Sequence, residues 1–270
     1  MVDARAGRVQ HLARPQLGRG AAPHRILARG NRLVMGAAYG DSAFFLPSAH
    51  RDRVWVVDLD RTALVRAVRE VTIDGETTVG AVETPGRQLP LAAVGDGLLL
   101  AARGGVDVWD PATQRVVRHL PVNPSDLGPA DGDVVSACAA ACAALRLFDV
   151  DSGAARDVRA PSGYRFEPWS ARFSPSNDLL GVAVRRAGGD DDAPRRLALV
   201  DTAKARAAVV PGSRVPPGYT LVAWSASSEH VFITGGHRLA RRVIVGYRVG
   251  TPRARAIDAE VGAFYDLAAI

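Results

Sequence analysis

A short hydrophobic phrase recurs along this chain at intervals of about fifty residues. Each copy alternates apolar and other residues, ends on an aromatic or aliphatic residue and then usually Asp, and is followed by a polar turn and a second apolar run. The copies end at Asp58, Asp110, Asp149, Asp201 and, with Arg in place of Asp, Arg248, while Val2 and Asp3 resemble the tail of a sixth. Such alternation is typical of half-buried strands.

The repeat length determines the predicted fold class. A period near fifty residues is typical of propeller blades and is too long for most helical solenoids. Each unit contains four short apolar runs separated by turn residues, and these runs are clearest at residues 165–174, 179–184, 196–200 and 206–210. The sequence therefore predicts an all-β protein, a β-propeller of about six four-stranded blades, with five complete blades and one closing or incomplete blade.

The uninterrupted repeat predicts a single β-propeller domain over residues 1–270. Its closing blade would combine residues from about 1–20 with residues 258–270. That blade lacks a second strand and most of a third, and an open sheet edge exposes unpaired backbone groups. One hypothesis is that the natural chain begins upstream of Met1, and that the missing segment supplies these strands and an export signal or membrane anchor.

Charge and hydropathy limit the partners of this chain. The formal net charge is +6 and the pI is near 10, but the basic residues are scattered through every repeat. Lys204 is the only lysine, which is the bias of a GC-rich coding sequence. A dispersed positive field argues against a nucleic-acid partner. No run approaches the roughly twenty apolar residues of a membrane span. We therefore expect a monomer that is cytoplasmic as written, or in the cell envelope if an upstream segment exists.

Cys138 and Cys142 are the only cysteines, and they lie in an Ala-rich run. The flanking apolar residues alternate with period two, which favours a hairpin here over the helix that Ala propensity would allow. Two thiols alone do not complete a structural zinc site. The preferred interpretation is a pair of small buried apolar residues, and a disulfide across the hairpin is the alternative.

Two turns carry a family resemblance. The segment Phe173-Ser-Pro-Ser-Asn-Asp178, which follows Pro168-Trp-Ser170, and the segment Ala223-Trp-Ser-Ala-Ser-Ser-Glu-His230 resemble the Trp-Ser-Pro-Asp-Gly turn repeated in TolB-like and WD40-like bacterial propellers. The resemblance implies membership of that broad superfamily and its fold. It does not imply a particular activity.

The sequence shows none of the usual catalytic signatures. It has no His-Glu-x-x-His, no Gly-x-Ser-x-Gly and no phosphate-cradling Gly-rich loop. We interpret the repeated Asp residues as turn residues whose carboxylates bond backbone N–H groups. Residues 190–192 are interpreted as a solvated acidic loop, with calcium binding as the alternative. The sequence therefore predicts no catalytic residue, no metal ligand and no cofactor.

Binding residues are predicted on the loops of one propeller face. The longest such loop, residues 39–52, contains Phe44, Phe45 and His50, and its aromatics would either anchor a partner or fold back over a blade. Other loops of that face are predicted to contribute a second set of candidates: Arg185, Asp190, Asp191 and His237.

These loops support one leading functional hypothesis. The chain would be a non-catalytic binding or scaffold propeller that presents its loop-rich face to an unidentified protein or small ligand. The alternative is a propeller hydrolase or lyase whose axial pocket assembles His and carboxylate groups from several blades.

Overall fold

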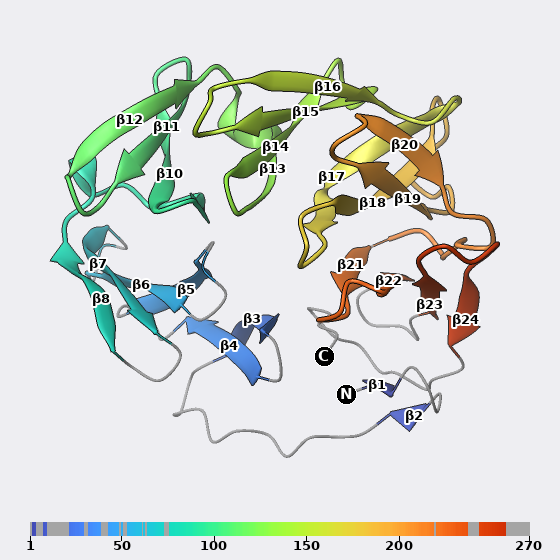
Figure 1. The fold of residues 1–270 in the computed structure, drawn as a ribbon, viewed down its shortest axis with the longest axis horizontal. Coiled ribbons are helices and arrows are strands. Elements are labelled where there is room, and N and C mark those ends of the chain that lie inside the picture. Colours follow the sequence, from blue (N-terminus) through green and yellow to red (C-terminus); the bar gives the residue numbers. More distant parts are fainter. Residues whose placement is uncertain are drawn as a thin grey trace. The chain divides into compact units, whose positions relative to one another are not determined.

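The computed structural model shows strands joined by short turns (Figure 1). It describes the backbone of residues 43–257 except residues 49, 51–52, 61, 63, 73–75, 219 and 237–242. Before residue 43 it describes only the backbone of four strands, and the side chains of residues 43–45, 47 and 131 are also outside the description.

Most described strands belong to five four-stranded sheets in which the strands follow one another in sequence order. The first sheet contains β5 (Ala43–Pro47), β6 (Arg53–Leu59), β7 (Val65–Thr72) and β8 (Thr77–Val82). The second contains β9 (Ala92–Val94), β10 (Gly97–Ala102), β11 (Gly105–Asp110) and β12 (Arg115–Leu120). The third contains β13 (Leu127–Asp131), β14 (Val134–Ala139), β15 (Ala144–Asp149) and β16 (Ala155–Arg159).

The remaining two four-stranded sheets complete the repeat. One contains β17 (Tyr164–Phe173), β18 (Leu179–Arg186), β19 (Arg196–Asp201) and β20 (Arg206–Val209). The other contains β21 (Leu221–Trp224), β22 (His230–Gly235), β23 (Val243–Arg248) and β24 (Arg255–Ile257). Two two-stranded sheets pair β1 (Val2–Asp3) with β2 (Arg8–Val9) and β3 (Ala22–Arg29) with β4 (Arg32–Ala38). Two 3-10 turns, η1 (Pro85–Arg87) and η2 (Pro124–Asp126), lie between sheets.

The chain divides into two compact units. Unit 1 comprises Met1–Arg14, Ala137–Leu147 and Arg156–Ile270, and unit 2 comprises Pro15–Ser136 and Phe148–Ala155. Each unit has its own core. In unit 1 one cluster of buried hydrophobic residues includes Leu197, Trp224 and Ile233, and in unit 2 another includes Trp55, Leu98 and Trp109.

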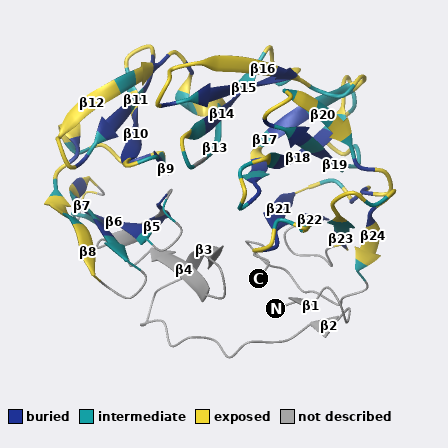
Figure 2. Cartoon of the chain, in the orientation of Figure 1, coloured by how far each residue is buried: buried dark blue, intermediate teal, exposed yellow. Residues whose placement is uncertain are grey.

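Burial follows the strand order within each sheet (Figure 2). Inner strands such as β18 and β19 are largely buried, and the first strand β21 is buried throughout. Fourth strands such as β8, β12 and β16 are mostly exposed. Small residues let neighbouring sheets approach: a Cβ added at Gly181 would lie 3.0 Å from Val222 and 3.2 Å from the Trp224 indole nitrogen.

The two related turns have the same hydrogen-bond pattern, which explains their sequence. In the first, the Leu179 N–H donates to Ser174 Oγ at 3.1 Å, and the Ser174 N–H donates to the Leu179 carbonyl at 2.7 Å. In the second, His230 and Ser225 make the equivalent bonds at 3.0 Å and 2.8 Å. The serine therefore closes the hairpin between the first and second strands of each sheet.

The same motif joins neighbouring sheets of unit 1. The indole N–H of Trp224 donates to the Arg172 carbonyl at 2.8 Å, and the Ser176 N–H donates to Ser228 Oγ at 3.1 Å. Both bonds connect the β17–β20 sheet to the β21–β24 sheet.

Most of the repeated aspartates close turns, as predicted. Asp110 accepts the Ala112 N–H at 2.8 Å, Asp149 accepts the Ser152 N–H at 2.8 Å, and Asp201 accepts the Lys204 N–H at 2.8 Å. Each of them ends the third strand of its sheet.

The first copy differs from the others. Asp58 lies within β6, the second strand of its sheet, and forms an ion pair with Arg69 at 2.9 Å. The turn is closed by Asp60, which accepts the N–H groups of Thr62 at 2.8 Å and Leu64 at 3.1 Å. The prediction for Asp58 is therefore wrong, because the strand continues past it to Leu59.

The predicted loop at residues 39–52 is also corrected. Its central part is strand β5, in which Phe44 pairs with Val57 and Phe45 pairs with Val56. The apolar run between Ala43 and Pro47 adds a strand to the edge of β6, which satisfies backbone groups that a loop would leave open.

The sheets confirm the predicted all-β architecture of four-stranded units. The single-domain assignment and the closing blade remain predictions, since residues 258–270 lie outside the described part of the chain.

Candidate functional site

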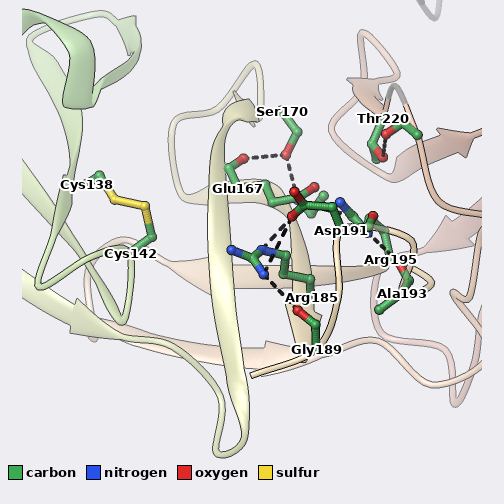
Figure 3. Close-up of polar contacts among 12 residues, drawn as sticks. Cys138, Cys142, Glu167, Ser170, Arg185, Gly189, Asp191, Ala193, Arg195 and Thr220 are labelled. Atoms are coloured by element: carbon green, nitrogen blue, oxygen red, sulfur yellow. Dashed lines mark hydrogen bonds and ion pairs between the residues drawn. A yellow bond between two sulfur atoms is a disulfide. The ribbon is translucent and has the colours of Figure 1, made fainter. Parts of the chain in front are cut away.

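A buried ion pair lies at one end of the β17–β20 sheet, in unit 1 (Figure 3). Glu167 Oε1 on β17 accepts a hydrogen bond from Arg195 Nε at 2.7 Å, and both side chains are 7% exposed. Arg195 immediately precedes β19 and forms an isolated bridge with Val215. Its Nη1 also donates to the backbone carbonyls of Asp191, at 2.6 Å, and Ala193. Arg195 therefore ties the loop of residues 187–195 to Glu167.

A bulge in β17 positions Glu167. The ladder with β18 runs regularly to the pair Glu167 and Ala183, then shifts register before Arg172. Ser170 closes the bulge, because its hydroxyl donates to the Glu167 carbonyl at 2.7 Å and accepts the Ala183 N–H at 2.8 Å. Pro168 has no N–H and so leaves no ladder donor unpaired at this point.

The environment of Glu167 disfavours its charged form. Burial raises the pKa of the Glu167 carboxyl above its ordinary value, and the charge of Asp191 adds to that effect. The charges of Arg195 and Arg185 and the hydrogen bond from Arg195 oppose the rise without cancelling it. The second carboxylate oxygen, Oε2, is buried and has no hydrogen-bond partner among the described residues.

Arg185 is the more exposed cation of the site. Its side chain is 29% exposed, and its Nη1 donates to the Gly189 carbonyl at 3.2 Å. Its Nε lies 4.0 Å from Glu167 Oε1, and its Nη1 lies 4.0 Å from Oδ1 of Asp191, whose side chain is 95% exposed. Both separations exceed hydrogen-bonding range.

The structure thus brings together two of the residues predicted from sequence, Arg185 and Asp191. Arg185 belongs to strand β18 and not to the predicted loop, whereas Asp191 and the exposed Asp190 lie in the loop that follows. Sequence analysis missed Glu167 and Arg195, which hold the loop. A charged residue beside Phe166 in an otherwise half-apolar strand was the available signal for Glu167. Nothing in the sequence distinguished Arg195 from the neighbouring Arg196.

Of the remaining candidates, only His50 has a described side chain. His50, in unit 2, contacts Asp96 at 2.7 Å and is 39% exposed at its side chain. His237 lies outside the described residues, and only the backbone of Phe44 and Phe45 is described. A role in partner binding for these four residues stays a prediction.

A disulfide between Cys138 and Cys142 closes the turn between β14 and β15, with the two Cα atoms 4.9 Å apart. The strands confirm the predicted hairpin, but the preferred interpretation of two unlinked apolar residues is wrong. Ala140, Ala141 and Cys142 have φ values of 50°, 52° and 64°, a region that residues with a Cβ rarely occupy. The Cys142 carbonyl accepts the N–H of Phe166 at 2.9 Å, which connects this turn to the residue beside Glu167.

Among the described residues, no group of three His, Cys, Asp or Glu side chains is arranged to hold a metal ion. Over the same part of the chain, no helix has the length and apolar character that crossing a membrane would require.

Comparison with solved structures identifies the fold. The chain is similar to the WD40 repeats of RRP9 (11% identity, TM-score 0.55, 93% of this chain and 85% of that one). It is similar to oligogalacturonate lyase from Vibrio parahaemolyticus (12% identity, TM-score 0.53, 84% and 74%). It is also similar to a putative TolB from Agrobacterium tumefaciens (11% identity, TM-score 0.50, 88% and 86%).

These similarities show that the chain has the β-propeller fold, which its two turns predicted. The chain spans 62% of the length of TolB from Acinetobacter baumannii. No protein-family model and no curated protein sequence matches the chain. At this level of identity the comparisons indicate fold and leave function to the site itself.

Proposed function

We propose that this chain is a non-catalytic binding propeller that presents the charged end of the β17–β20 sheet to a protein or small ligand. The observation that carries the proposal is a change in exposure across one short loop. The Arg195 side chain is 7% exposed, whereas the carboxylate of Asp191, four residues away, is 95% exposed.

The buried pair gives that loop a defined position. Burying two charges costs several kcal/mol per ion, and a pair with good geometry recovers only part of that cost. Here the pair connects the loop carbonyls of Asp191 and Ala193 to Glu167 on β17. Because the loop is ordered before a partner arrives, less conformational entropy is lost on binding.

The local chemistry favours binding over catalysis. The Ser170 hydroxyl, which bonds the Glu167 carbonyl, is fully buried and already both donates and accepts a hydrogen bond. It therefore has no role available as a nucleophile. Oligogalacturonate lyase, an enzyme by its name, shares the fold, so the fold alone does not decide between the two functions.

Charge reversal of the loop tests the proposal. The intact protein would carry Asp190→Lys and Asp191→Lys, and a matched control would carry Asp126→Lys, an exposed carboxylate in unit 2. Partners cross-linked in the native host would be compared by quantitative mass spectrometry. We expect the loop variant to recover at least one partner in a different amount from the wild type and the control. Identical partner sets in identical amounts for all three proteins would refute the proposed surface.

A further inference from the structure

Two arginines face one another at the exposed end of β17 and β18. Arg165 and Arg185 are direct partners in the antiparallel ladder. Directly opposed residues project from the same face of a sheet, with their Cβ atoms about 5 Å apart. Glu167 lies two residues along β17 from Arg165 and so belongs to the same face. Like charges in this position repel each other unless an anion lies between or beside them.

The carboxylate in the neighbourhood does not neutralise both arginines. Glu167 is committed to Arg195 at 2.7 Å, and its distance to Arg185 is 4.0 Å. A guanidinium has five N–H donors. Arg185 uses one of them, toward the Gly189 carbonyl, and no described residue hydrogen-bonds or ion-pairs with the half-buried Arg165 side chain.

From this juxtaposition we infer that Arg165 and Arg185 form a binding site for a carboxylate group of a partner peptide. Planar guanidinium groups bind carboxylates through paired N–H···O bonds, and two of them on one sheet face can hold one carboxylate from both sides. The inference rests on the proposed binding function and names the chemistry of the ligand.

The neighbouring acidic loop favours a carboxylate over a phosphate. The exposed residues Asp190, Asp191 and Asp192 repel a dianion more strongly than a monoanion. The Asp191 carboxylate also lies 4.0 Å from Arg185, too far for a hydrogen bond but close enough to compete with an incoming carboxylate. Removing the charge of Asp191 should therefore strengthen binding, whereas removing an arginine should weaken it.

The test uses the intact protein with ¹⁵N-labelled arginine and follows the side-chain Nε–Hε signals by NMR. The probes are a capped Ala-Glu-Ala peptide, the same peptide with Gln in place of Glu, and inorganic phosphate. The variants are Arg165→Gln, Arg185→Lys and Asp191→Asn. The control is Arg186→Gln, which alters an exposed arginine on the opposite face of the same strand. Thermal melting curves establish that each variant is folded.

We expect the Glu peptide alone to shift the Arg165 and Arg185 signals saturably. Arg165→Gln and Arg185→Lys should each weaken binding by about tenfold or more. Asp191→Asn should tighten it about two- to fivefold, and Arg186→Gln should leave it unchanged. Equal shifts at all arginines, saturation by phosphate alone, or an equal effect of the Gln peptide would overturn the inference.

The two proposals fail differently. If the loop variant changes the recovery of a partner but the Glu peptide does not bind at Arg165 and Arg185, the binding surface stands and the carboxylate assignment is wrong. If the loop variant recovers the same partners in the same amounts as the wild type, the proposed function is wrong, whatever the peptide does.

Discussion

Replacing Arg195 by Met would leave Glu167 without its hydrogen-bonded partner at a position where its side chain is 7% exposed. Removing one partner of a buried pair typically costs about 3–5 kcal/mol, because the remaining charge stays out of water. For a protein of about this length, that cost lowers the melting temperature by roughly 6–20 °C. The measurement is the thermal unfolding of wild type and Arg195→Met at pH 7.

The double variant Glu167→Leu/Arg195→Met separates loss of the pair from loss of packing. It removes both charges, so we expect it to be more stable than Arg195→Met alone. A double variant as unstable as the sum of the two single variants would refute the argument, because it would show that the two side chains are not energetically coupled.

The pH dependence of the same variant has a definite sign. The folded pKa of Glu167 is raised above its unfolded value, mainly by burial. Such a group stabilises the folded protein at low pH, and that contribution is lost as the pH rises through the folded pKa. Without Arg195 the pKa rises further. We therefore expect the stability difference between wild type and Arg195→Met to shrink as the pH falls through the two folded pKa values, both of which lie above the ordinary Glu value of 4.5, and to be smallest below that value.

The remaining predictions concern packing, the disulfide and the turns. In a urea titration, Gly181→Ala should lower the free energy of unfolding by about 1–3 kcal/mol, because the added Cβ would lie 3.0–3.2 Å from packed groups. Gly80→Ala should lower it little, because nothing lies within 4 Å of a Cβ added there. Reducing the disulfide, which joins residues four apart, should lower the free energy of unfolding by about 2 kcal/mol. An unchanged melting temperature in reductant would contradict that prediction. The pKa of Asp201 is held below its ordinary value by hydrogen bonds from the Lys204 backbone and side chain, so its stabilising contribution should disappear only as the pH falls through that lowered pKa. Carboxyl NMR of Asp201 would test this, and an ordinary pKa would contradict the turn assignment.

The sequence predicted the sheets well where turn chemistry and hydrophobic alternation agree. The strands from Tyr164 to Val209 match their predicted bounds to within two residues, because polar turns separate them clearly. The prediction that Asp58 closes a turn failed because the local pattern does not show that β6 continues to Leu59. The loop assignment of Phe44 and Phe45 failed for a related reason. Their pairing with Val57 and Val56 is non-local, and a short apolar run flanked by polar residues is also compatible with a loop.

The site was only partly predictable. The proximity of Arg185 and Asp191 could be predicted, because Arg185 lies near the end of β18 and Asp191 lies in the loop that follows it. The ion pair that holds this loop could not be predicted, because it joins Glu167 and Arg195, which are 28 positions apart, and depends on the bulge that Ser170 closes. The disulfide likewise depended on the geometry of the turn at residues 140–143.

The most direct test of the central claim, that a buried ion pair anchors an exposed charged loop, is a carboxyl-carbon NMR titration of Glu167 in the intact protein. We predict a pKa above 4.5 in the wild type and a further rise in Arg195→Met. A Glu167 pKa at or below 4.5 that does not respond to the loss of Arg195 would contradict the claim.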